Sequence, residues 1–99
     1  MLQINSTQGI TEVIGNLESV NSKSLNIHFE TLFKTEERII LSLDKLVSID
    51  NSGINCLINL YKKASKNNII FYVIGKTNKK IAKKIQKTKL NYVVKADFI

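Results

Sequence analysis

The residue types best suited to chemistry lie at one junction, where a mostly apolar stretch ends and a helical pattern begins. Leu46–Ile49 is followed at once by Asp50, Asn51, Ser52 and Gly53. This order predicts a strand that runs into the N-terminus of a helix. Unpaired backbone N–H groups and a partial positive charge gather at a helix start, so the junction favours anions, phosphates and capping oxygens. We therefore take it as the first candidate for a functional site.

The side chains that most often carry catalysis have no partners in this sequence. His28 falls in a predicted helix, and no serine or cysteine lies in a nucleophile-elbow setting. Cys56 lies between apolar neighbours in another predicted helix, and we interpret it as a small buried side chain. The P-loop, Gly-x-Gly-x-x-Gly and Gly-x-Ser-x-Gly patterns are all absent. The sequence therefore predicts no catalytic residues, no metal site and no cofactor.

Positive charge is concentrated in the last third of the chain. Residues 1–61 carry four basic and seven acidic side chains, a net −3, whereas residues 62–99 carry eleven lysines and one acid, a net +10. Between residues 76 and 89 the lysines are Lys76, Lys79, Lys80, Lys83, Lys84, Lys87 and Lys89. This cluster is interpreted as a solvated face, as a surface for an acidic protein, or as a contact for nucleic acid or anionic lipid. A compositional bias towards lysine is a further alternative.

Size and composition limit the class of protein. The chain has 99 residues, of which 43% are apolar, and it contains no proline or tryptophan. No stretch reaches the roughly 18 apolar residues that a membrane helix needs, and the first residues lack the pattern of a signal peptide. A single cysteine excludes an internal disulfide. These features predict one cytoplasmic domain over residues 1–99, without membrane insertion.

Hydrophobic spacing predicts that strands and helices alternate. Two paired strands, around Leu2–Ile4 and over Ile10–Gly15, are joined by a turn over residues 6–9. A first helix begins at a cap formed by Asn21 or Ser22. The apolar residues of this helix that recur at helical spacing are Leu25, Phe29, Leu32 and Phe33.

The second half continues the alternation. A strand over Arg38–Leu43 precedes the junction, and a second helix follows the junction. Ile69–Ile74 is predicted as an interior strand, Asn78–Lys87 as a third helix and Tyr92–Val94 as a last short strand. The inward positions are Ile54, Leu57, Ile58 and Tyr61 in the second helix and Ile81 and Ile85 in the third.

These elements position the junction at one edge of a sheet. The order β, β, α, β, α, β, α, β predicts a single α/β domain with an open, mostly parallel sheet of about four to five strands and about three helices. Functional sites in such sheets favour loops at the carboxyl ends of strands. Two such loops, Asp50–Gly53 and Gly75–Asn78, follow strands that we expect to be adjacent and central.

Four short segments occur in the order and spacing of one known family. They are Gly15–Leu17, Ile39–Leu43, Ser48–Ile54 and Val73–Gly75. The third follows the family's signature of a strand, then Asp-Ser-Ser/Thr-Gly-Leu/Ile, then a helix, at every position except Asn51. On these segments the chain resembles the STAS domain, the fold of the bacterial anti-sigma factor antagonists, over nearly its whole length.

The resemblance implies a protein-binding module and not an enzyme. In partner switching, such a domain binds an anti-sigma factor that is also a serine kinase with an ATP-binding fold, and it thereby frees the sigma factor for transcription. The kinase phosphorylates the serine directly after the motif's aspartate, which abolishes binding, and a phosphatase restores it. A phosphate adds about −1.5 to −2 charges to the contact surface, which is enough to reverse a modest binding free energy.

The chain departs from the family motif at the phosphate acceptor. Asn51 follows Asp50, and an amide has no hydroxyl for a phosphate, although it suits a helix start nearly as well as serine. Ser52 is the hydroxyl that remains, and it is the candidate for phosphorylation at a position that is not the family's usual acceptor. By resemblance, the partner-binding loop comprises Asp50, Asn51, Ser52, Gly53, Asn55, Gly75, Lys76 and Thr77.

Two classes of function remain open. The first is a regulatory module that docks a kinase or anti-sigma partner and that Asn51 holds in its binding-competent form. The second is a small cytoplasmic subunit of a lipid-transporting ABC complex, where the partner is the transporter ATPase and no phosphate switch is needed. A nucleic-acid binder is a third interpretation, disfavoured because arginine and interleaved aromatic residues are missing from the lysine cluster.

Overall fold

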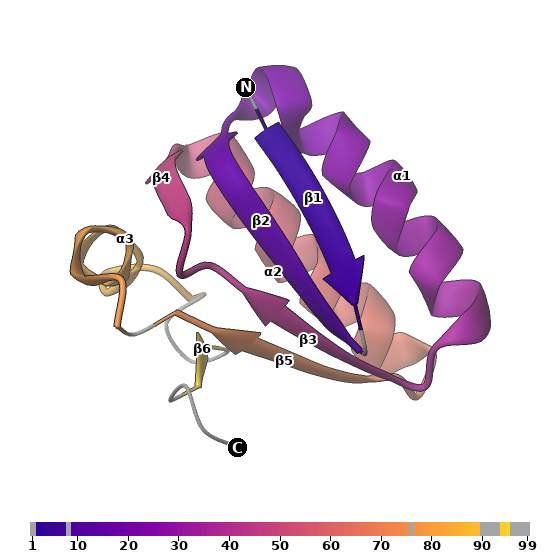
Figure 1. Ribbon diagram of the computed structural model, residues 1–99. Helices are drawn as coiled ribbons and strands as arrows, with labels where there is room; N and C mark the ends of the chain where they lie inside the picture. Colours follow the sequence, from indigo (N-terminus) through magenta and orange to yellow (C-terminus); the bar gives the residue numbers. More distant parts are fainter. Residues whose placement is uncertain (1, 8, 76, 90–93, 96–99) are drawn as a thin grey trace.

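The chain forms one sheet with two long helices on one side and a short helix at its edge (Figure 1). The computed structural model describes residues 2–7, 9–75, 77–89 and 94–95. The elements are β1 (Leu2–Thr7), β2 (Ile10–Leu17), α1 (Ser19–Thr35), β3 (Arg38–Ser42), β4 (Leu46–Ile49), α2 (Asn51–Lys66), β5 (Ile70–Ile74), α3 (Lys79–Ile85) and β6 (Val94–Lys95). The predicted α/β class is confirmed.

Strand β2 pairs with three other strands of the sheet. It pairs antiparallel with β1 along its length, from Leu2 opposite Gly15 to Thr7 opposite Ile10. On its other side, its first half pairs parallel with β3 and its second half pairs parallel with β4. Strand β5 pairs parallel with β3, and β6 pairs parallel with β5. The mostly parallel sheet is therefore confirmed, and β1 is its antiparallel edge.

The segment between α1 and α2 differs from the predicted order of elements. The predicted order counts one strand there, whereas the structure has two: β3, and β4, which is the strand predicted to run into the junction at Asp50. A turn separates them, in which the Leu46 N–H donates to the Leu43 carbonyl at 3.1 Å. Because β2 has eight residues and β3 and β4 have five and four, both short strands pair with the same side of β2 in succession. The strand that leads to Asp50 is thus a neighbour of β2.

Helix α1 begins before its predicted caps. It starts at Ser19 with Glu18 as the N-cap, so the prediction of Asn21 or Ser22 as the cap is wrong. Asn21 instead occupies the third helical position, where its Oδ1 accepts a hydrogen bond from the Glu18 N–H at 2.8 Å. A polar side chain at this position is the second half of a capping box. Asn21 therefore stabilises the helix start from inside the first turn.

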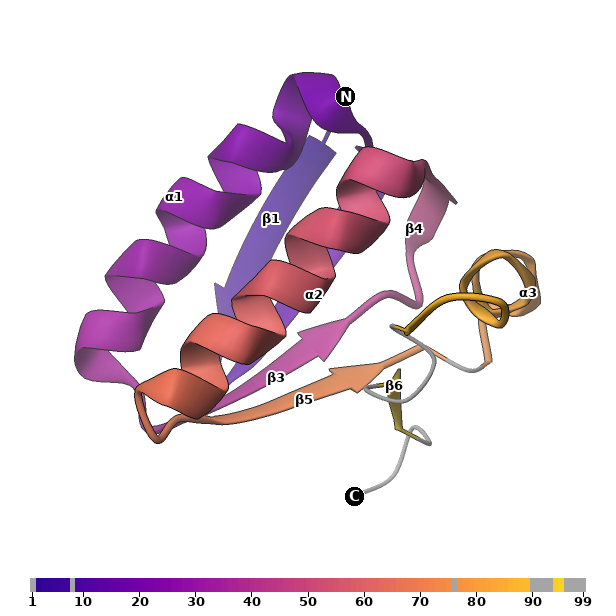
Figure 2. The same ribbon diagram turned by 180° about the vertical axis from the view of Figure 1, so that it is seen from behind.

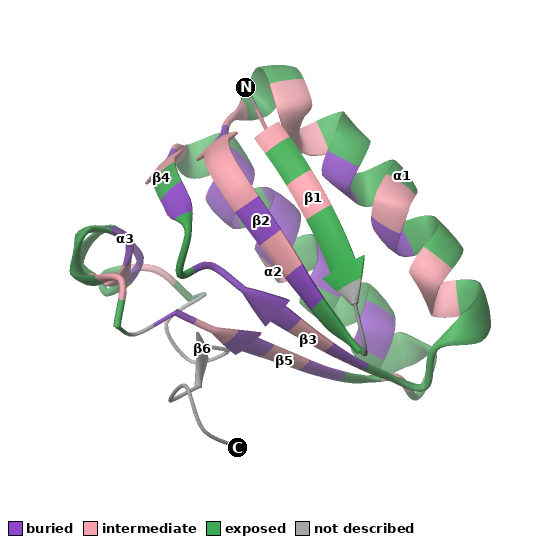
Figure 3. Cartoon of the chain, viewed as in Figure 1, coloured by how far each residue is buried: buried purple, intermediate pink, exposed green. Residues whose placement is uncertain are grey.

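Helices α1 and α2 cover the same face of the sheet (Figure 2). The buried residues of the helices and of alternate strand positions meet between these two layers (Figure 3). Phe29 of α1 is fully buried, and its ring centroid lies 5.6 Å from that of Phe71 on β5 in an edge-on arrangement. The largest fully buried side chains are Phe29, Leu17, Leu25, Ile39, Leu41, Leu43, Ile49, Leu57, Ile81, Val13 and Val73.

The buried side of α2 differs in part from the predicted one. Ile54 and Leu57 are buried as predicted, but Leu60 and Ala64 continue the buried stripe. The predicted fourth member, Tyr61, is 39% exposed. A stripe over positions 54, 57, 60 and 64 follows the helical repeat and runs along one side of the helix.

The last elements agree with the predicted ones where the structure describes them. Asn78 caps α3, and Ile81 and Ile85 of α3 are buried. Strand β6 shares Val94 with the predicted last strand, whose other residues, 92 and 93, lie outside the described residues. Among the helices that the structure describes, none is both long and apolar enough to cross a membrane.

Candidate functional site

Asp50 connects the starts of the two long helices. Its backbone is extended, and its Oδ1 accepts a hydrogen bond from the Gly53 N–H at 2.8 Å, so it is the N-cap of α2. Its Oδ2 lies 3.4 Å from the backbone nitrogen of Ser19, the first residue of α1. A carboxylate between two helix N-termini satisfies unpaired N–H groups and interacts favourably with both dipoles. Asp50 therefore links the first turn of α2 to the first turn of α1.

Replacing Asp50 with alanine is expected to lower the free energy of unfolding by about 1 kcal/mol, because the first turn of α2 loses its capping oxygen. Asp50→Asn is expected to keep most of the stability, since asparagine is an equally good N-cap. Urea denaturation of the three proteins measures the difference. Equal stability of Asp50→Ala and the wild type would contradict the capping role.

The side chains after Asp50 are presented to solvent. Asn51 and Ser52 occupy the first two positions of α2, and both are exposed, as is Asn55 one turn further on. The hydrogen bonds of the described residues include none from these three side chains. A partner could therefore contact them without first breaking an internal bond.

Gly53 holds α2 against the end of β2. It is buried, and a Cβ built on it lies 2.4 Å from the Leu17 carbonyl oxygen and 2.8 Å from Cγ1 of Ile49. No larger residue fits at this distance from a backbone atom unless the helix moves. This close packing determines how far Asn51 and Ser52 extend from the end of β2.

The second predicted loop is attached to the β3–β4 turn. Gly75 is buried, and a Cβ on it lies 2.9 Å from the Cβ of Leu43. Thr77 is exposed, and its hydroxyl donates to Asp44 Oδ1 at 2.8 Å. Lys76, the third predicted residue of this loop, lies outside the described residues. Gly75 and Thr77 are thus placed against residues 43–44, and the described contacts do not join them to Asp50.

The expectation that the two loops follow adjacent strands is wrong. Asp50 follows β4, which pairs with β2, whereas Gly75 follows β5, which lies beyond β3. Because β3 ends where β4 begins, the β5–α3 loop lies at the level of the start of β4 (Figure 1). Four residues of strand span about 13 Å. The candidate site therefore divides into the Asp50 junction and a separate rim at residues 43–44 and 75–77.

Two asparagines at this edge have roles that the sequence did not reveal. Asn78 Nδ2 donates to the carbonyls of Leu43 and Leu46, both at 2.9 Å, and thereby fixes α3 to the β3–β4 turn. Asn16 accepts at Oδ1 from the Ser48 hydroxyl at 2.6 Å, which ties β2 to β4. Asn78 is recognisable as a helix start, but its partners lie more than 30 residues away.

The cysteine is confirmed as a buried side chain. Cys56 is 6% exposed, and its Sγ lies 3.4 Å from Oδ1 of Asn26. Burial raises the pKa of the Cys56 thiol to about 11, so the thiol stays protonated at neutral pH. A protonated, buried thiol is neither a good nucleophile nor a metal ligand.

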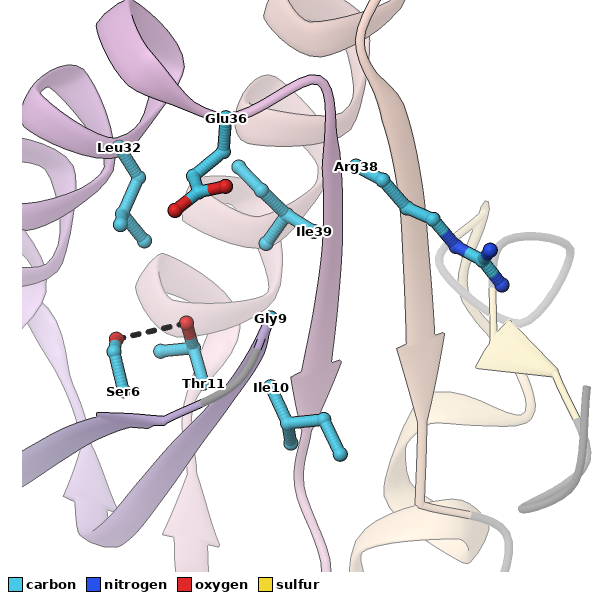
Figure 4. A pocket seen from close by; sticks show the side chains of 8 residues that line it. All are labelled: Ser6, Gly9, Ile10, Thr11, Leu32, Glu36, Arg38 and Ile39. Carbon is cyan, nitrogen blue, oxygen red and sulfur yellow. Dashed lines mark hydrogen bonds between the residues drawn. The ribbon is translucent and has the colours of Figure 1, made fainter.

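His28 contacts β1 at the opposite end of the sheet from Asp50. Its Nε2 lies 2.9 Å from the hydroxyl of Ser6, which in turn lies 2.9 Å from the hydroxyl of Thr11. Ser6 and Thr11 line a cavity of about 100 Å³ together with Glu36 (Figure 4). This volume is well below the roughly 300 Å³ at which small-molecule sites begin. Within the described residues, no cluster of three or more His, Cys, Asp or Glu is placed to hold a metal.

The lysines of α3 form an exposed surface beside β4. Ile81 and Ile85 are buried, whereas the described lysines of this part of the chain are all exposed. These are Lys79, Lys80, Lys83, Lys84, Lys87 and Lys89. The two ion pairs among the described residues, Lys45–Glu12 and Lys63–Glu30, do not involve them. The edge of the sheet that carries the rim at residues 43–44 and 75–77 is therefore strongly basic.

The sequence and the fold identify the family. The family model of the STAS domain matches residues 1–97, and the chain belongs to the STAS domain family. No curated protein is detectably similar in sequence.

Solved structures agree with this assignment. The chain is similar to the unphosphorylated form of the anti-sigma factor antagonist SpoIIAA of Bacillus, with a TM-score of 0.75 and 14% identity over 97% of this chain and 87% of that one. An anti-sigma factor antagonist from Mycobacterium paratuberculosis gives a TM-score of 0.73 and 16% identity over 100% and 86% of the two chains. A sulfate transporter family protein from Wolinella succinogenes gives 0.66 and 17% over 96% and 82%. At these identities the likeness establishes a common fold.

Proposed function

We propose that this STAS domain is a non-catalytic regulatory module that docks a protein partner at the start of α2, in the manner of an anti-sigma factor antagonist. The observation that carries the proposal is the exposure of Asn51 and Ser52 on a first turn that Asp50 and Gly53 hold rigidly. A rigid, exposed turn recognises a partner at little entropic cost. The proposed partner is an anti-sigma factor with a kinase-type ATP-binding fold, in the cytoplasm.

The proposal includes the absence of the usual phosphate switch. Asn51 stands at the position of the acceptor serine, and it cannot be phosphorylated. Ser52 has a hydroxyl, but it is the second residue of the helix and follows a residue that occupies the acceptor position. The domain is therefore proposed to stay competent to bind, with its activity set by the amounts of its partners.

Capture of partners by the full chain tests the docking site. The site variant Asn51→Glu/Ser52→Glu adds two negative charges at a helix N-terminus, where the dipole tolerates them. Its matched control is Asn59→Glu/Ser65→Glu, which makes the same two changes at exposed positions further along α2. We expect a kinase-type ATPase to be captured by the wild type and the control and to bind the site variant about tenfold more weakly or less. Equal binding to both variants contradicts the site.

Phosphorylation of the partner complex tests the switch separately. The captured ATPase is incubated with ATP and the wild-type chain or Asn51→Ser, and the products are analysed by mass spectrometry. We expect phosphate on residue 51 of Asn51→Ser and none on the wild type. A phosphate adds charge and bulk in the contact surface, so the phosphorylated variant is expected to lose binding. Phosphate on Ser52 of the wild type would overturn the proposed absence of a switch.

The second candidate function is a subunit of a transport complex. It is favoured by the similarity to a sulfate transporter family protein and by the missing acceptor hydroxyl at residue 51, because such a role needs no phosphate cycle. The same capture experiment distinguishes the two. Recovery of a transporter ATPase in place of a kinase-type protein supports the transport role.

A further inference from the structure

Six exposed lysines gather on α3 and on the turn that follows it. No acidic residue lies between residues 76 and 89, so the charge of this span is of one sign. We call these six residues the lysine face: Lys79, Lys80, Lys83, Lys84, Lys87 and Lys89. The ion pairs of the described residues, Lys45–Glu12 and Lys63–Glu30, include none of them. The lysine face is therefore a positively charged surface in contact with water.

Helix α3 turns its lysines away from the body of the protein. With about 100° of rotation per residue, the four lysines of the helix lie within an arc of about 140°, and Ile81 and Ile85 lie on the opposite side. Both isoleucines are buried in the domain. The apolar side of α3 is thus already used for packing, and it cannot enter a lipid bilayer or contact a partner. Only the charged side is open to contact.

Hydrogen bonds at both ends of α3 fix the lysine face relative to the sheet. Asn78 caps the helix, and its Nδ2 donates to the carbonyls of Leu43 and Leu46, both at 2.9 Å. At the other end, the hydroxyl and the N–H of Thr88 donate to the Ile85 carbonyl at 2.7 and 2.8 Å. The helix lies at the edge of the sheet beside β4 (Figure 1). The domain therefore presents the lysines on a rigid, outward-facing helix.

The spacing of the lysines opposes the stability of α3. Lys79 and Lys83 are four residues apart, as are Lys80 and Lys84. Like charges at this spacing are neighbours on the surface of a helix and destabilise it. An anionic partner removes this repulsion. A local arrangement that costs stability in the free protein and that a partner relieves is typical of a functional surface.

The residue types of the lysine face distinguish among anionic partners. Protein interfaces are rich in arginine and aromatic residues and poor in lysine, and neither an arginine nor an aromatic residue lies between residues 76 and 89. Nucleic acids are bound with aromatic side chains that stack on bases and with arginines that read base edges. Clusters of about four to eight basic residues on an amphipathic helix are typical of a contact with anionic lipid headgroups. The lysine face fits the last of these classes.

We propose that the lysine face binds the surface of an anionic membrane without insertion into the bilayer. The ammonium groups are attracted to the lipid phosphates, and each lysine near the surface strengthens binding about fivefold. Because the attraction is one of charge alone, it is expected to act within about 10 Å at an ionic strength of about 0.1 M. The proposal goes beyond the docking of a protein partner at the start of α2 and does not depend on it.

Co-sedimentation of the full chain with lipid vesicles tests the membrane contact. Vesicles of equimolar phosphatidylglycerol and phosphatidylcholine are compared with vesicles of phosphatidylcholine alone. We expect the wild-type chain to bind the anionic vesicles at low salt and not to bind the neutral ones. We also expect release at about 1 M salt, where the Debye length is about 3 Å. Equal binding to both kinds of vesicle, or binding that salt does not change, overturns the proposal.

Two variants of equal net charge locate the contact. Lys79→Gln/Lys83→Gln removes two charges from the side of α3 that is opposite its buried residues. The matched control, Lys62→Gln/Lys66→Gln, removes two exposed charges at the same spacing near the end of α2, which leads into β5, whereas α3 follows β5 (Figure 2). We expect the α3 variant to bind anionic vesicles about twentyfold more weakly and the control to bind nearly as the wild type does. Equal losses in the two variants overturn the proposal.

Competing anions test the assignment to lipid. Duplex DNA and polyglutamate are offered to the wild-type chain at the same concentration of negative charge as the anionic vesicles. Tighter binding to either polymer than to the vesicles overturns the assignment. Circular dichroism checks the fold of both variants, and glutamine is a good helix former, so α3 is expected to persist. The comparisons of vesicles, salt and polymers use the wild type alone, so they remain decisive whatever the stability of the variants.

Discussion

Phe29→Ala is expected to lower the free energy of unfolding by about 3–5 kcal/mol, the range for removal of a buried aromatic ring. Phe29 is fully buried, and its ring contacts the rings of Phe33 and Phe71 at centroid distances of 5.8 and 5.6 Å. The substitution leaves a cavity between α1 and β5 that the backbone cannot close. A domain of this size has a total stability of about 5–15 kcal/mol. The substitution therefore removes a large part of the free energy that keeps the domain folded.

Urea denaturation measures this effect, and the same helix supplies the control. Val20 is 85% exposed on α1, so Val20→Ala removes apolar atoms that are already in water. Its stability is expected to change by less than about 0.5 kcal/mol. Equal losses for Phe29→Ala and Val20→Ala would contradict the packing of α1 against the sheet.

Gly53→Ala is expected to destabilise the protein by about 1–3 kcal/mol, as overpacking of a filled site does. Alanine has a helix propensity about 1 kcal/mol better than glycine, so the change would stabilise an unconstrained helix. Here the added methyl group lies 2.4 Å from the Leu17 carbonyl oxygen, a backbone atom that cannot move without the strand. Steric overlap therefore outweighs propensity, and the first turn of α2 is displaced.

Ser52→Ala is the control for Gly53→Ala, since it adds no atoms and changes the exposed neighbour in the same turn. We expect it to keep the wild-type midpoint in urea. A displaced first turn also moves Asn51 and Ser52, so Gly53→Ala is expected to weaken partner capture while the chain remains folded. If Gly53→Ala is more stable than the wild type, the close approach of α2 to β2 is contradicted.

The sequence located the Asp50 junction because the signals there are local. A carboxylate, a glycine and the start of the apolar repeat lie close together in sequence there, and in the structure Asp50 caps α2 and Gly53 packs closely against β2. The capping role of Asn21 was harder to place, because a polar residue near a helix start stabilises it either from the cap or from the third position. Local patterns therefore indicated the elements better than their boundaries.

The pairing of the strands was not predictable in the same way. The β3–β4 turn and the attachment of Thr77 to Asp44 depend on contacts between segments about 30 residues apart. Hydrophobic pattern alone does not specify which parallel strands become neighbours. The predicted binding loop is divided into the Asp50 junction and the rim at residues 43–44 and 75–77 because of this pairing.

What the amino-acid sequence determined by itself was the α/β class and the buried faces of most elements, and it predicts that Asn51 replaces the family's phosphate acceptor. Each of these depends on residue type and short-range spacing. Only the tertiary structure decided that β3 and β4 both pair with β2, that Asp50 joins two helix starts, and that Ile10 of β2 and Ile70 of β5 stay exposed. An apolar strand is equally consistent with one covered face or two, and the placement of the helices decides between them.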